Sequence, residues 1–63
     1  MRVGKIFSMP NEYTRFARIR DKDGSTFTVD PSLLPEGASK NKNVAYRVEI
    51  WGSGGLVNYV EED

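Results

Sequence analysis

Apolar and polar residues alternate along most of this chain with a period of two, which predicts β-strands. The clearest signal lies in residues 14–34, where two alternating runs flank the turn sequence Asp-Lys-Asp-Gly-Ser at positions 21–25. Asp-Gly between alternating runs is the strongest short-range signal of a β-hairpin. One face of this hairpin is expected to be buried, and it carries Ala17, Ile19, Phe27 and Val29. The other face is mixed polar and aromatic, and we expect any functional surface there. It carries Phe16, Arg18, Arg20, Thr28 and Asp30.

Three further strands are predicted. Residues 2–9 form the first strand, and the adjacent apolar residues Ile6 and Phe7 interrupt its alternation, which predicts a bulge or a strong bend. Residues 44–51 alternate most regularly, and one face of this strand carries Val44, Tyr46, Val48 and Ile50. Residues 56–60 form the last strand, after a glycine-rich turn at residues 52–55 and before an acidic tail.

The connections complete an all-β layout. Pro10-Asn11-Glu12 is a turn signal, after which Tyr13 is expected to open the hairpin. Residues 31–35 are bounded by prolines and predict a single helical or tight turn, with Leu33 or Leu34 beneath the sheet. Residues 36–43 form a polar loop, the segment most expected to be mobile. A meander, a loop and a last hairpin predict a small five-stranded antiparallel barrel that forms one domain over residues 1–63.

The composition limits what such a barrel can do. The chain has no histidine and no cysteine, so the usual general bases, thiol nucleophiles and transition-metal ligands are missing. The glycine run at residues 52–55 lacks the Lys-Ser/Thr that a phosphate-cradling loop requires. We therefore expect no enzyme, no catalytic residue, no metal site and no cofactor. The absence of cysteine and of a long apolar run indicates a soluble, cytoplasmic protein without a membrane partner.

Positive charge is clustered although it is balanced overall. Nine basic and nine acidic residues give zero net charge, so the chain as a whole is not drawn to nucleic acid. The predicted first hairpin nevertheless carries Arg15, Arg18, Arg20 and Lys22, while residues 61–63 are acidic. These groups form either a basic patch on one side or simply the solvated faces of a small domain.

Three segments resemble motifs of one family. The opening VGKIFSMPNE is similar to a strand that begins Gly-Lys-Val-Lys-Trp-Phe-Asn, with agreement at Gly4, Lys5 and Ile6. TRFARI resembles the first ribonucleoprotein motif, Lys-Gly-Phe-Gly-Phe-Ile, at Phe16 and Ile19. FTVDPSLL resembles the second motif, Val-Phe-Val-His-Phe-Ser-Ala-Ile, and the positions that fit are Phe27, Val29, Ser32 and Leu34. The family is that of the bacterial cold-shock proteins, whose fold is a five-stranded barrel of the oligonucleotide-binding type.

The resemblance implies weak binding of single-stranded RNA or DNA. Of the family's base-stacking aromatic and histidine positions, only Phe16 is unchanged; Arg18, Thr28 and Asp30 replace others. The candidate rings are Phe7, Tyr13 and Phe16, and Thr28 shares the face. The candidate cations are Arg18, which can stack on a base, and Lys5, Arg15 and Arg20, which can meet phosphates.

Each candidate has an alternative reading. Phe7 belongs to the core if Ile6 turns outward, and Tyr46 is expected in the core. Asp30 would repel a phosphate chain. Trp51 is either a cap over the open end of the barrel or a contact residue. The same barrel could therefore dock on a protein instead of nucleic acid, with Phe16, Arg18 and Trp51 as anchors. The oligomeric state is not predicted.

Overall fold

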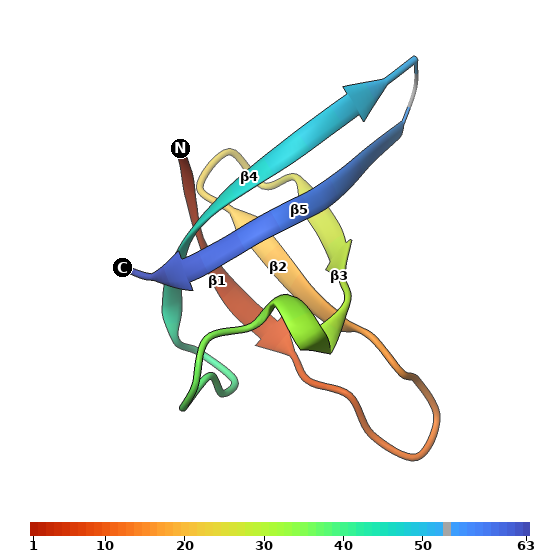
Figure 1. The fold of residues 1–63 in the computed structure, drawn as a ribbon, viewed down its shortest axis with the longest axis vertical. Coiled ribbons are helices and arrows are strands. Elements are labelled where there is room, and N and C mark those ends of the chain that lie inside the picture. The colour runs from red at the N-terminus through yellow and green to blue at the C-terminus, as the bar shows by residue number, and fades with distance from the viewer. Residues whose placement is uncertain (53) are drawn as a thin grey trace.

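The computed structural model describes residues 1–52 and 54–63, and it contains five strands and one short 3-10 helix. The strands are β1 (Arg2–Ser8), β2 (Ala17–Asp21), β3 (Thr26–Val29), β4 (Asn43–Trp51) and β5 (Gly54–Glu62), and the helix is η1 (Pro31–Leu33). They form one antiparallel sheet in the order β3-β2-β1-β4-β5, and β5 returns against β3 (Figure 1). The sheet is thus a nearly closed barrel, and the predicted all-β fold of five antiparallel strands is confirmed.

The hairpin of β2 and β3 forms as its sequence predicts. The Asp21 N–H donates to the Ser25 carbonyl oxygen at 2.8 Å, and the Gly24 N–H donates to the Asp21 carbonyl oxygen at 3.0 Å. Gly24 has a φ of 93°, which only glycine adopts without strain. The register pairs Ala17 with Val29 and Ile19 with Phe27, so the predicted inner face is confirmed.

The start of the hairpin differs from the prediction. The strand begins at Ala17, and Tyr13 and Thr14 lie in the preceding loop. The Asn11 side-chain oxygen accepts hydrogen bonds from the Tyr13 N–H at 2.7 Å and the Thr14 N–H at 3.2 Å. Such a local side-chain turn gives the backbone an alternative to strand pairing, and the alternation of residues 14–16 does not reveal it.

The interruption at Ile6 and Phe7 is a bulge. Ile6 pairs with Ile19 and Ser8 pairs with Arg18, so Phe7 is the extra residue of β1. Ile6 is fully buried and Phe7 faces outward, half-buried. The predicted bulge is confirmed, and the alternative that placed Phe7 in the core is wrong.

The core fills the barrel from every strand. Its buried residues are Ile6, Ala17, Ile19, Val29, Val44, Tyr46, Val57 and Val60, which confirms the placement of Tyr46. Leu33 and Leu34 pack against this core from the turn after β3, as predicted. Asp30 caps η1, since its carboxylate accepts a hydrogen bond from the Ser32 N–H at 2.9 Å.

The last hairpin is longer than predicted. β5 begins at Gly54 and runs through Glu61 and Glu62, which pair with Ala45 and Val44. The expected acidic tail is therefore mostly strand, because β4 supplies partners for it. The β4–β5 hairpin projects beyond the barrel (Figure 1), which leaves Ile50 exposed although it shares a face with Tyr46. Of the predicted glycine-rich turn, Ser53 lies outside the described residues.

In the described part of the chain, no helix is long and apolar enough to cross a membrane.

Candidate functional site

An aromatic ring flanked by two guanidinium groups lies on the outer face of β1 and β2. The Cζ atoms of Arg18 and Arg20 lie 5.4 and 4.5 Å from the centroid of the Phe7 ring. The bulge in β1 turns Phe7 to this face, and the alternation of β2 presents both arginines to it. Each such cation–π contact stabilises an exposed pair by about 0.5–1 kcal/mol. We call Lys5, Phe7, Arg18 and Arg20 the Phe7 cluster.

Among the described residues, no carboxylate oxygen lies within 4.0 Å of a cationic nitrogen of the Phe7 cluster. Lys5 lies directly opposite Arg20 across β1 and β2, where like charges destabilise the sheet. Within residues 1–52 and 54–63 the ion pairs involve Arg2, whose Nη1 lies 3.6 Å from Asp21 and 4.0 Å from Asp23. This face therefore gathers three cations, which suit an anion, although Asp21 and Asp63 line the pocket beside it and the whole chain is neutral.

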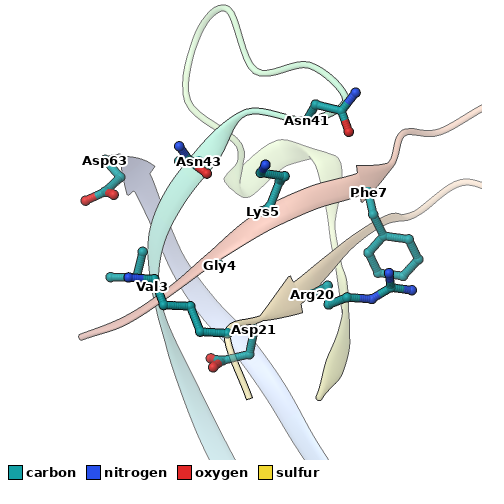
Figure 2. Close-up of a pocket in the computed structure, with 10 residues that line it drawn as sticks. Val3, Gly4, Lys5, Phe7, Arg20, Asp21, Asn41, Asn43 and Asp63 are labelled. Carbon is teal, nitrogen blue, oxygen red and sulfur yellow. The ribbon is translucent and has the colours of Figure 1, made fainter. Parts of the chain in front are cut away.

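A groove of about 510 Å³ runs beside the Phe7 cluster. Figure 2 shows Phe7 and Arg20 together on one side of it, and Lys5 rising toward Asn41 and Asn43 on the other. The loop that carries Asn41 is tied to β1, because the Asn41 N–H donates to the Ile6 carbonyl oxygen at 2.7 Å. Side-chain amides offer both donors and acceptors to a ligand. The sequence analysis missed the two asparagines, since a polar loop carries no signal of where it folds.

Asp21 lines the same groove, but its carboxylate is already engaged. It accepts a hydrogen bond from the Tyr46 hydroxyl, and Arg2 lies beside it. The Tyr46 hydrogen bond holds the pKa of Asp21 below its ordinary value, with further help from the Asp23 N–H and Arg2. Burial, followed by the Asp21 carboxylate, raises the pKa of Tyr46. Through this pair, a residue that lines the groove is hydrogen-bonded to a residue of the core.

Phe16 lies apart from the Phe7 cluster. Its side chain is 45 % exposed and lines a second groove, of about 480 Å³, between β3 and β5. We call this the seam groove. Its lining consists of Phe16, Thr28, Asp30, Ser32, Leu33, Gly55, Leu56, Val57 and Asn58. The one face expected from the sequence is therefore divided between two surfaces.

The remaining candidates lie at the edges of these surfaces. Thr28 pairs with Arg18 across β2 and β3 and also lines the seam groove, so it stands between the two. Tyr13 is 89 % exposed in the loop between β1 and β2, and Arg15 is exposed in the same loop. Neither of them lines either groove. Trp51 is 58 % exposed at the end of β4.

The described residues contain no group of three His, Cys, Asp or Glu side chains that could hold a metal ion.

Comparisons with protein-family models, with curated proteins and with solved structures find no match for this chain, so the relation to cold-shock proteins stays a prediction.

Proposed function

We propose that this protein binds single-stranded RNA or DNA, weakly, through the Phe7 cluster, as a divergent cold-shock-like barrel. The observation that carries this proposal is that the Arg18 and Arg20 guanidinium groups lie over the Phe7 ring, with Lys5 adjacent. In the part of the chain that the structure describes, no carboxylate oxygen lies within 4.0 Å of these cations. Proteins that hold single strands combine aromatic platforms with a positively charged path for the backbone. The resemblance of residues 4–6 and 16–34 to cold-shock motifs supports the same function.

The guanidinium groups extend the aromatic platform. Because Arg20 already lies over the Phe7 ring, a base stacks on the outer side of that guanidinium plane, and ring, guanidinium and base form one column. Lys5, directly opposite Arg20, then meets the neighbouring phosphate. Asn41 and Asn43 face the same groove and supply hydrogen-bonding groups for a base edge.

The binding is expected to be weak and sensitive to salt. Each stacked base contributes about 1–3 kcal/mol, and this cluster offers few stacking positions. For single strands the logarithm of the affinity falls with the logarithm of the salt concentration by about 0.7 for each phosphate neutralised. The cluster has three cations, so we expect a slope of about −2. We place this activity in the cytoplasm, because a chain without cysteine suits a reducing compartment.

A titration with a fluorescent single-stranded oligonucleotide at low salt, followed by amide chemical shifts, tests the proposal. We expect the shifts to map to Lys5, Phe7, Arg18 and Arg20. Arg18→Glu should abolish them. Arg47→Glu is the matched control, because Arg47 also lies over a ring, that of Tyr59 at 5.7 Å, on the β4–β5 hairpin. If no shift maps to residues 5–30 at high oligonucleotide concentration, this function is excluded.

Docking on a protein is the second candidate function. It is favoured by the exposure of two large aromatic side chains, Phe16 and Trp51, outside the Phe7 cluster. An affinity pull-down from lysate, with and without nuclease, separates the two functions. A protein that is retained after nuclease treatment and lost on Phe16→Ser or Trp51→Ser would favour docking through these side chains.

A further inference from the structure

The seam groove lies where the barrel does not close by strand pairing. β3 and β5 approach each other there (Figure 1), but the hydrogen-bonded order of the sheet ends with these two strands. Buried Val57 forms the floor of the groove. Phe16, half-buried Leu33 and Leu56, which is 48 % exposed, form its walls. The groove thus offers apolar surface to an occupant.

A single negative charge stands at the edge of this apolar surface. One oxygen of the exposed Asp30 carboxylate accepts the Ser32 N–H at 2.9 Å. This hydrogen bond lowers the pKa of Asp30, so the group is ionised at neutral pH. None of the residues that line the groove is basic, and in the described part of the chain no Lys or Arg nitrogen lies within 4.0 Å of Asp30.

These features select the chemistry of the occupant. A phosphate chain is disfavoured, because it would meet the Asp30 carboxylate in a groove that has no cation. A basic side chain can pair with Asp30, and its guanidinium can lie against the exposed Phe16 ring. Apolar side chains beside that cation would cover Leu33 and Leu56.

We propose that the seam groove binds an extended peptide segment in which an arginine or lysine is flanked by apolar residues. The segment lies between β3 and β5, with its cation at Asp30 and its apolar side chains on Leu33 and Leu56. This inference goes beyond the proposed function, because none of the four residues of the Phe7 cluster lines the seam groove. One barrel would then hold nucleic acid on β1 and β2 and a protein at the seam.

Capped peptides that contain Leu-Arg-Leu or Leu-Glu-Leu in a Gly-Ser context are the probes. Titrated into the labelled protein, Leu-Arg-Leu should give saturable amide shifts at Phe16, Asp30, Leu33 and Leu56. Leu-Glu-Leu should bind several-fold more weakly, because its carboxylate meets Asp30. Equal binding of the two peptides, or no saturable shift at the seam, would overturn the proposal.

Single substitutions test separately how much the Asp30 charge and the apolar surface contribute to peptide affinity. Asp30→Asn should weaken binding of the Leu-Arg-Leu peptide about two- to fivefold, the range of an exposed ion pair. It should leave the fold intact, because asparagine caps a helical turn as well as aspartate does. Glu12→Gln removes the same charge outside the groove and should change nothing. Leu56→Ser should weaken binding about fivefold or more through lost apolar contact. Unchanged affinity in both Asp30→Asn and Leu56→Ser would contradict the proposal.

Two further outcomes identify other occupants. Shifts at the seam on dilution of the protein alone would assign the groove to a second copy of this chain. Shifts at the seam caused by an oligonucleotide, with none caused by the peptide, would assign Phe16 to the nucleic-acid surface. Either outcome overturns the proposal. If the proposed nucleic-acid function is wrong, the oligonucleotide causes no amide shifts at the residues of the Phe7 cluster. The two failures are therefore distinguishable.

Discussion

The hydroxyl of Tyr46 donates a hydrogen bond to the carboxylate of Asp21, which lies 25 residues earlier in the chain. Tyr46 is buried in the core on β4, and Asp21 begins the turn that joins β2 to β3. The bond therefore ties the first hairpin to the last one across the barrel. Arg2, at the start of β1, lies beside the same carboxylate. Asp21 also lines the groove of the Phe7 cluster, so this bond connects the core to the candidate site.

Replacement of Tyr46 by phenylalanine should lower the free energy of unfolding by about 1–2 kcal/mol. The ring keeps its core contacts, including Phe27 at a centroid distance of 5.8 Å, while the Asp21 carboxylate loses its donor. Urea unfolding followed by circular dichroism measures the change. The control is Tyr59→Phe, which removes an exposed hydroxyl with a long 3.5 Å contact to Glu61 and should change stability little. Equal effects of the two variants would show that the Asp21–Tyr46 bond contributes nothing particular.

Acid should weaken the Asp21 contact. The pKa of Asp21 is lower in the folded protein than its ordinary value of 3.8, so folding favours the charged form. Its contribution to stability is complete above the unfolded pKa and is lost as the pH falls through the lower folded pKa. The difference in unfolding free energy between the natural protein and Asp21→Asn should therefore shrink below about pH 4. Urea unfolding at a series of acidic pH values measures it, and a difference that grows on acidification would contradict the assignment.

Alkali should weaken the same hydrogen bond by deprotonating its donor, the Tyr46 phenol. The pKa of Tyr46 is raised above its ordinary value of 10.0 by burial and by Asp21, so folding favours the neutral phenol. This contribution is complete below the unfolded pKa and is lost as the pH rises through the folded one. The stability difference between the natural protein and Tyr46→Phe should stay constant up to about pH 10 and fall above it. A constant difference into strong alkali would indicate that the Tyr46 phenol is not perturbed by folding.

Gly4 provides a prediction about the barrel itself. A Cβ atom at this position would lie 2.6 Å from the Arg20 carbonyl oxygen and 2.9 Å from Ile19 Cγ2. Gly4→Ala should therefore destabilise the protein by about 1–3 kcal/mol, the range of overpacked substitutions, because β1 and β2 must separate. Gly54→Ala is the control, since the nearest atom to its Cβ is 4.0 Å away. Thermal unfolding compares the two, and a fully stable Gly4→Ala protein would mean that the strands separate at little cost.

The sequence was most informative where one residue pair or dipeptide determines geometry. Asp23-Gly24 placed the β2–β3 turn, and adjacent Ile6 and Phe7 placed the bulge in β1. The bulge left open which of the two residues turns inward, and the structure resolves that choice in favour of Ile6. Contacts between distant segments gave no local signal. The Asp21–Tyr46 bond, the place of Asn41 beside Lys5 and the longer β5 all depend on how the barrel closes.

The division of the candidate face between two surfaces also depends on contacts that strand alternation does not reveal. Alternation puts Phe16 and Arg18 on one side of an ideal strand, yet Phe16 lies in the loop before β2, where the Asn11 turn has already redirected the chain. The bulge then brings Phe7 to Arg18 and Arg20, while Phe16 lines the seam groove together with β5 residues. Strand periodicity does not encode either rearrangement, so the residues that the sequence places on one surface lie on two.

This division yields a paired test of the two rings. Phe7→Leu should weaken oligonucleotide binding about fivefold or more, because it removes the ring of the stacking column while leucine preserves apolar contact with the arginine side chains. Phe16→Leu should leave oligonucleotide binding unchanged, since Phe16 lies at the seam beside Asp30. Fluorescence anisotropy at low salt measures both affinities, and urea unfolding checks that both variants are folded. If Phe16→Leu alone weakens binding, the contact is Phe16, and the Phe7 cluster is only a structural arrangement of charge over a ring.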